Sequence, residues 1–132
     1  MSNSFEQISL KHGFMKHNGG VMFRNISENE YEFKSIINEN HLNAAGITHG
    51  GYLAALIDAG AGTAVHRNSQ SAQCVTISVD LKYIGASKIG DEIIGHVKIL
   101  KKTKTLVFLF CELKCNNKIT VSYTHLTLPT SR

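Results

Sequence analysis

One carboxylate, Asp58, interrupts a run of small and apolar residues that follows Gly51 and has the spacing of a helix. The positions three and four residues away on either side hold no lysine or arginine: Ala54, Ala55, Ala61 and Gly62. A buried carboxylate without such a partner is unfavourable unless it is hydrogen-bonded or protonated. Two interpretations follow. Asp58 either hydrogen-bonds a neighbouring loop from the flank of the helix, or it lies in an apolar cleft as a general base or nucleophile.

A polar loop that ends in paired glycines precedes this run. Gly50 and Gly51 fall at the start of the helix, where the first N–H groups have no intrahelical acceptor and the helix dipole is positive. A backbone amide in this place can polarise a carbonyl oxygen, as an oxyanion hole does in acyl transfer. Alternatively, the glycines only relieve crowding in a tight turn. Asn43 and His49 flank the same loop, so a polar pair, an amide donor and a carboxylate would converge near one helix.

The elements that must position these residues are predicted from periodicity. Apolar or small residues recur with helical spacing at Leu53, Leu56, Ile57, Gly60, Ala61, Ala64 and Val65. The remaining positions are also small, which predicts a helix that is buried nearly all round. Runs rich in β-branched and aromatic residues predict strands at 21–27, 31–37, 74–84, 91–100, 105–113 and 118–122. A short amphipathic helix is expected around Phe5, Ile8 and Leu10. The predicted class is therefore α+β: a strand pair, a central buried helix, and a four-strand antiparallel run that wraps the helix.

Composition narrows the classes of function. The chain has 132 residues, 42% hydrophobic and 18% charged, which fits one globular domain. No apolar run reaches the length of about 20 residues that a membrane span needs, and no secretory leader pattern is visible, so the cytoplasm is expected. The formal charge of +4 forms no basic stripe, which argues against nucleic acid. The lysines of 101–104 are expected in a solvated hairpin turn, with phosphate binding as the alternative.

Three cysteines, Cys74, Cys111 and Cys115, are too few and too irregularly spaced for a disulfide framework or a zinc site. Cys111 and Cys115 share one face of a predicted strand and are expected to be buried thiols. A metal site from His41, His49 and Asp58 is not expected, because the spacing is not that of a helical zinc motif.

The pattern N-x-x-G-x-x-H-G-G-x6-D, formed here by Asn43, Gly46, His49, Gly50, Gly51 and Asp58, resembles the hotdog-fold acyl-CoA thioesterases. The resemblance is to the PaaI-like type of the 4-hydroxybenzoyl-CoA thioesterase superfamily. It continues through "TISVDLKYIGASKIGDEIIGHVKILKKTKTLVF" and covers the chain from about residue 18 to 120. It implies an antiparallel sheet wrapped around a central helix, hydrolysis of an acyl-CoA thioester to free acid and CoA, no cofactor, and a homodimer or homotetramer.

The resemblance also implies roles for individual residues. The thioester carbonyl would rest on the N–H of Gly51, and Asp58 of the partner subunit would activate water or attack directly. Asn43 would orient the water or the thioester, and His49 would brace the loop. Thr76 matches a family hydroxyl that assists at the reacting centre.

The expected substrate-binding residues are Gly50, Tyr83 and Lys88, with the CoA phosphates near Lys88 or Lys102. The other histidines are expected to be structural. His41 would be a surface or loop-packing residue, His66 would suit the negative end of the helix dipole, and His96 would be half-buried and hydrogen-bonded.

Two other functions stay open. A hydratase or dehydratase on the same fold fits the H-G-G-x6-D spacing less well. A non-catalytic acyl-CoA-binding module would need no carboxylate at position 58.

The final residues, "VSYTHLTLPTSR", break the preceding pattern and contain the one proline of the chain. They resemble translated adapter sequence. We therefore expect a hotdog thioesterase domain over 1–120 and a non-native tail over 121–132.

Overall fold

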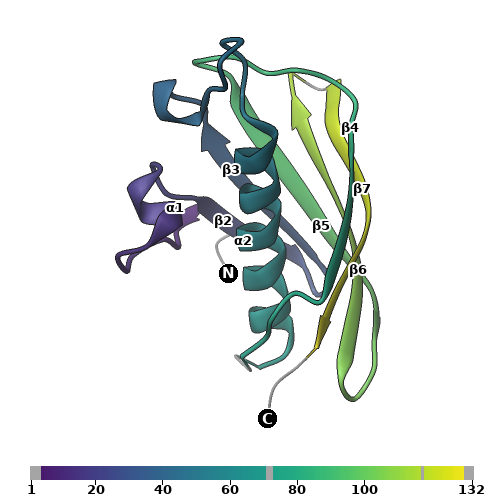
Figure 1. Cartoon of the computed structure of the whole chain (residues 1–132). Helices are drawn as coiled ribbons and strands as arrows, with labels where there is room; N and C mark the ends of the chain where they lie inside the picture. Colours follow the sequence, from purple (N-terminus) through teal and green to yellow (C-terminus); the bar gives the residue numbers. More distant parts are fainter. Residues whose placement is uncertain (1–3, 71–72, 117, 130–132) are drawn as a thin grey trace.

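The computed structural model describes residues 4–70, 73–116 and 118–129. Seven strands form one sheet in the order β1-β2-β3-β5-β6-β7-β4, and the long helix α2 lies across one face of it (Figure 1). The pairings between these strands are all antiparallel. The elements are β1 (Glu6–Gln7), α1 (Phe14–His17), β2 (Met22–Ser27), β3 (Glu30–Ile36), the 3-10 helix η1 (Glu39–His41), α2 (Gly50–Asn68), β4 (Ser78–Tyr83), β5 (Glu92–Lys102), β6 (Leu106–Cys115) and β7 (Lys118–Pro129).

The predicted β2–β3 hairpin and the β5–β6–β7 run are confirmed, but β4 does not pair with β5, as a continuous four-strand antiparallel run would require. β3 occupies that edge of β5, in a register that runs from Glu30 opposite Lys98 to Ile36 opposite Glu92. β4 pairs instead with β7, at the far edge of the sheet. The segment 84–91 is therefore a crossover rather than a hairpin turn, and Figure 1 shows it passing from β4 to β5.

The helix predicted around Phe5, Ile8 and Leu10 is also wrong. Residues 6–7 form β1, which pairs with β2, and the helix α1 begins only at Phe14. The ring of Phe5 lies against the cationic groups of Arg24 and Lys34, with 4.3 and 4.4 Å from ring centroid to cation. This contact and the pairing with β2 favour an extended backbone here.

The central helix is confirmed, but within one chain only one side of it is buried. The buried residues of α2 are Tyr52, Leu53, Leu56, Ile57, Gly60, Ala61, Ala64 and Val65. Gly60 faces Gly95 of β5 across the ring of Phe33, and a β-carbon at either glycine would overlap that ring. The opposite side of α2 is made of small, half-buried residues, among which Asp58 and His66 are exposed.

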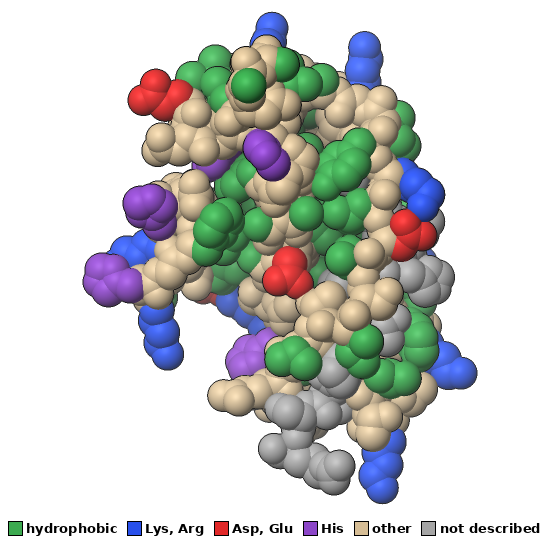
Figure 2. Space-filling view, in the orientation of Figure 1, with side chains coloured by type: hydrophobic (Ala, Val, Ile, Leu, Met, Phe, Trp, Pro, Cys, Tyr) green, Lys and Arg blue, Asp and Glu red, His purple; other side chains and the backbone are tan. Residues whose placement is uncertain are grey.

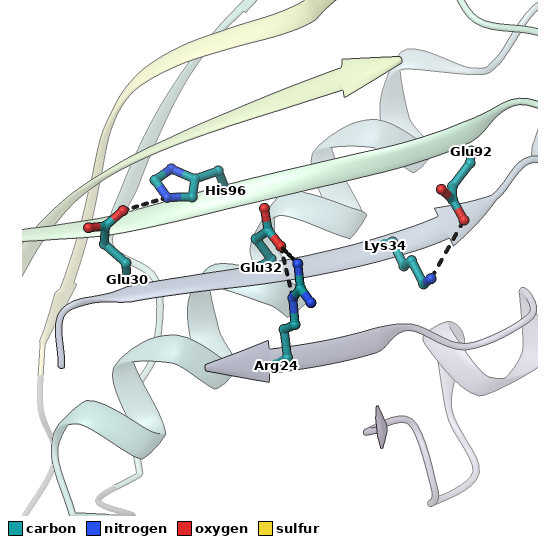
Figure 3. A network of polar contacts seen from close by, with 6 residues as sticks. All are labelled: Arg24, Glu30, Glu32, Lys34, Glu92 and His96. Carbon is teal, nitrogen blue, oxygen red and sulfur yellow. Dashed lines mark hydrogen bonds and ion pairs between the residues drawn. The ribbon is translucent and has the colours of Figure 1, made fainter. Parts of the chain in front are cut away.

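The sheet face turned away from α2 is covered by paired charges (Figure 3). Arg24 pairs with Glu32, Lys34 with Glu92, and His96 with Glu30 at 2.8 Å, each between neighbouring strands. The side chain of His96 is 32% exposed, which confirms the half-buried, hydrogen-bonded histidine that was predicted. Opposite charges on adjacent strands contribute modestly to sheet stability.

Cys111 and Cys115 of β6 are 0% and 7% exposed, as predicted for buried thiols. Burial raises the pKa of the Cys111 thiol far above its usual value, so this thiol stays protonated and unreactive. Among the described helices, none is both long and apolar enough to cross a membrane.

The contact of Gly60 with Phe33 generates a test of the helix–sheet packing. Gly60→Ala should lower the free energy of unfolding by about 1–3 kcal/mol, because its methyl group has no space beside the ring. Gly62→Ala is the matched control, since a β-carbon there meets nothing within 4 Å. It should leave stability unchanged or raise it by up to about 1 kcal/mol through helix propensity. Urea unfolding followed by circular dichroism measures both, and equal effects of the two changes would contradict this packing.

Candidate active site

The first turn of α2 is capped by the residue that precedes it. The Nδ1 atom of His49 accepts a hydrogen bond from the N–H of Gly51 at 2.8 Å. His49, Gly50 and Gly51 are thus brought together, and the predicted oxyanion donor already has a partner. A substrate carbonyl that binds this amide must share it with the imidazole or displace the imidazole.

Asn43 closes the loop before α2. Its side-chain oxygen accepts hydrogen bonds from the N–H groups of Ala45 (2.9 Å) and Ile47 (3.3 Å), and Gly46 has a φ of 82°. This is an Asx-type turn with a left-handed glycine, which explains why the pattern needs both residue types. The side chain of Asn43 is therefore held by its own loop.

The crossover 84–91 and the end of β4 anchor this loop from the other side. The buried Thr48 donates both its N–H (2.9 Å) and its hydroxyl (3.1 Å) to the carbonyl of Ser87. The hydroxyl of Tyr83 donates to the carbonyl of Gly50 at 2.8 Å. The exposed Lys88 follows Ser87 directly, so its backbone lies beside the loop that leads to α2.

His41 has a larger structural role than the sequence indicated. It is 1% exposed, so it packs a loop as expected but is not a surface residue. Its Nδ1 accepts from the N–H of Asn38 (3.0 Å), so the proton lies on Nε2, which donates to the carbonyl of Asn18 (2.5 Å). The ring stacks on Tyr52 of α2 with 3.7 Å between centroids, and the carbonyl of His41 accepts from the N–H of His49 at 2.7 Å. His41 thus fixes both the first turn of α2 and the residue that caps it.

Asp58 meets Thr76 on the outer side of α2. The hydroxyl of Thr76 donates to Oδ1 of Asp58 at 2.5 Å; in the single chain Asp58 is exposed and Thr76 is half-buried. Asp58 is therefore not buried by its own chain, and it bonds a neighbouring loop from the flank of α2, as the first of the two interpretations expected. On this face of the molecule, hydrophobic side chains gather along α2 and between α2 and β4 (Figure 2). Val75 and Ile77, on either side of Thr76, are 66% and 58% exposed.

Lys102 lies apart from this group. Its ammonium donates to the carbonyl of Asn68 at the last residue of α2 (2.9 Å). At 1.5 Å per residue, the 19 residues of α2 place it about 25–30 Å from Gly50. Residues 101–104 are exposed at the β5–β6 turn, which confirms the predicted solvated hairpin. Within the described part of the chain, no three His, Cys, Asp or Glu side chains are grouped to hold a metal ion.

Comparison with known proteins shows the family. Residues 45–122 match the model of the thioesterase superfamily, so the chain belongs to the thioesterase superfamily. Mouse acyl-coenzyme A thioesterase 13 is 36% identical over 84 residues, which cover 64% of this chain and 59% of the mouse protein. The match thus spans less than two thirds of that relative.

Two solved structures share the fold. Zebrafish thioesterase superfamily member 2 has a TM-score of 0.83 at 25% identity, over 93% of this chain and 90% of that chain. A hypothetical thioesterase from Streptococcus pneumoniae, solved with coenzyme A, has a TM-score of 0.78 at 18% identity, over 97% of this chain and 96% of that chain. The predicted hotdog fold and the predicted family are confirmed.

The hydrogen bonds of His41 can be tested by a change that keeps its aromatic stacking. His41→Phe leaves the N–H of Asn38 and the carbonyl of Asn18 without this partner, so the free energy of unfolding should fall by about 2–4 kcal/mol. His12→Phe, at an exposed position before α1, is the matched control and should change it by less than about 0.5 kcal/mol. Denaturant unfolding of both variants gives the comparison. If His41→Phe is no more destabilising than the control, the structural role of His41 is wrong.

Proposed function

We propose that the protein hydrolyses an acyl-CoA thioester to a free acid and CoA, with Asp58 as general base or nucleophile. The observation that carries the proposal is the 2.5 Å contact between Thr76 and Asp58, on the outer side of the helix that begins at Gly50. The thioesterase family and the mouse relative support the reaction class. The cytoplasmic location and the non-native tail over 121–132 stay predictions from the sequence.

The chemistry requires two copies of the chain. Asp58 lies seven residues after Gly51, which corresponds to about 10 Å along the helix. Reacting groups must approach to about 3–3.5 Å, so the carboxylate and the amide of one helix do not serve the same thioester carbon. A second α2 placed against the first would bring Asp58 of one copy opposite Gly51 of the other. This arrangement would also bury the carboxylate, as expected for a group with this role.

The edge strand β4 is the surface that we assign to this contact. Its one neighbour in the described sheet is β7, so its other edge is open. Val79 and Tyr83 of this strand are 42% and 53% exposed, and Ile77, directly before it, is 58% exposed. An open strand edge with apolar side chains favours pairing with another chain. A homodimer formed through β4 would extend the sheet and bring the two α2 helices onto the same side.

In the proposed reaction, Asp58 removes a proton from water as that water attacks the thioester carbonyl carbon. The carbonyl oxygen then carries the negative charge, and the N–H of Gly51 with the dipole of α2 stabilises it. The thiolate of CoA leaves as the carbonyl re-forms and is protonated on release. Thr76 holds one carboxylate oxygen of Asp58 by its hydroxyl, so the other oxygen is free to face the water. If Asp58 acts as nucleophile instead, the same amide stabilises the same oxyanion.

One observation favours a second candidate, a non-catalytic acyl-CoA-binding module. The N–H of Gly51 already has His49 as its acceptor, and Asp58 already has a hydroxyl partner. A binding module could keep both contacts unchanged with the ligand in place. The test of Asp58 separates the two candidates.

Asp58→Asn should lower thiol release from acyl-CoA by at least about 100-fold, because the amide is neither a base nor a nucleophile at neutral pH. Binding of acyl-CoA, measured by calorimetry, should change little, since the amide can still accept from Thr76. Glu28→Gln, at the exposed turn between β2 and β3, is the matched control and should keep normal turnover. Thiol release is measured with a panel of aryl and aliphatic acyl-CoA substrates. Tight binding without thiol release by the wild type would favour the binding module.

Ile77→Asp tests the partner contact at β4. A carboxylate at this edge should reduce dimer mass in light scattering and reduce thiol release to the same extent, since the site needs both copies. Ile89→Asp is the control. Ile89 is about as exposed as Ile77 (55% against 58%), but it lies in the crossover 84–91 and not at β4. It should change neither property. An Ile77→Asp monomer with full turnover would show that one chain suffices.

A further inference from the structure

The segment of residues 8–17, which we call the N-terminal lobe, presents apolar and basic side chains together to solvent. Leu10 and Phe14 are 70% and 61% exposed. Leu10 is the most exposed large hydrophobic residue in the described part of the chain. Lys11 and Lys16 are exposed beside them, as are His12 and His17. Figure 1 shows α1 to one side of α2, away from β4, and Figure 2 shows lysine and histidine side chains along that flank.

The lobe is held in place by its own hydrogen bonds and by two apolar contacts. Ile8 and Met15 pack against the core, and the N–H of Ile8 donates to Val21 at 3.0 Å. The ammonium of Lys16 donates to the carbonyl of Leu10 at 3.3 Å. Leu10 and Phe14 therefore project from a fixed backbone, and a partner that covers them need not order the segment first.

A shallow hollow of about 390 Å³ lies within the lobe, lined by Ile8, Leu10, Lys11, Met15 and Lys16, among others. Apolar side chains beside a hollow with basic groups at its rim match an acyl chain and an anionic headgroup in their chemistry. Lysine and arginine side chains place their stems on apolar surface and their charges in water in the same way at membrane interfaces.

The charges of the N-terminal lobe indicate which kind of partner binds it. Residues 8–20 contain no aspartate or glutamate, and the nearby Glu6 is paired with Arg67. A second copy that used the same surface would bring Lys11 and Lys16 close to their own counterparts, which is unfavourable. The lobe also lies next to β1, at the opposite end of the sheet from β4. We propose that the N-terminal lobe docks the protein reversibly on an anionic lipid bilayer, with Leu10 and Phe14 in the interface and Lys11 and Lys16 on the headgroups.

The docking would be weak and dependent on salt. Two apolar side chains and two lysines give weaker membrane binding than an amphipathic helix or a lipid anchor gives. Each lysine near an anionic membrane adds attraction that falls off within a Debye length. The protein would therefore sample the membrane surface rather than reside there. This inference does not depend on the proposed reaction.

Vesicle flotation of the full chain tests the proposal. We expect binding to phosphatidylcholine vesicles that contain phosphatidylglycerol, loss of that binding in high salt, and little binding to phosphatidylcholine alone. Leu10→Ser/Phe14→Ser should weaken binding by about tenfold through lost apolar burial. Lys11→Glu/Lys16→Glu should weaken it by about tenfold or more through charge reversal. The matched controls, Leu100→Ser/Ile89→Ser and Lys101→Glu/Lys104→Glu, alter exposed residues elsewhere and should stay within about twofold of the wild type.

Several outcomes would overturn the proposal. They are no flotation of the wild type, equal flotation with neutral vesicles, or equal losses in lobe variants and controls. A lower assembly mass of Leu10→Ser/Phe14→Ser in light scattering would show that a second copy covers the lobe instead. Thermal melts confirm that each variant is folded. Thiol release from a short-chain acyl-CoA in solution should be the same in the lobe variants and the wild type, so failure of the proposed reaction would appear there and not in flotation.

Discussion

The ring of Phe33 fills the space between α2 and the sheet, and the backbone on each side of it belongs to a glycine. Gly60 on α2 and Gly95 on β5 allow the helix to approach the sheet to the thickness of one aromatic ring. This packing decides which side of α2 is buried. The opposite side, with small residues around Asp58, is left facing outward. The accessibility of the carboxylate therefore depends on a contact on the other side of the helix.

The two groups of the proposed site, the amide of Gly51 and the carboxylate of Asp58, are held in place by different numbers of contacts. Hydrogen bonds and stacking from η1, from the loop before α2 and from the crossover 84–91 hold the helix start, where the amide of Gly51 lies. The carboxylate of Asp58 accepts a hydrogen bond from Thr76 of its own chain. A rigid amide is what an oxyanion site requires, because donors that are already in place need no reorganisation during the reaction. In the proposed dimer, a carboxylate with fewer contacts could adjust to a substrate that enters between the two copies.

The sequence predicted best those elements whose partners are close in the chain. Helical spacing from Leu53 to Val65 identified α2, and alternation in residues 31–37 identified the β2–β3 hairpin, since both patterns are local. β4 was misplaced because its partner, β7, follows two intervening strands. The depth of His41 was also missed, because its ring contacts come from Asn18, Asn38 and Tyr52, in three separate segments. The meeting of Asp58 with Thr76 was suggested only by family resemblance, since no spacing rule joins positions 18 residues apart.

The pairing of β4 has a consequence for how the molecule is made. Residues 78–83 find their partners in 121–127, about forty or more positions later and within the predicted non-native tail, so in this chain the edge stays unpaired until those residues have left the ribosome. Such distant pairings form slowly, and an apolar strand that waits for its neighbour is open to other chains in the meantime. The region around Thr76 would then be the last to fold, and slow or incomplete synthesis would affect it before the helix or the hairpins.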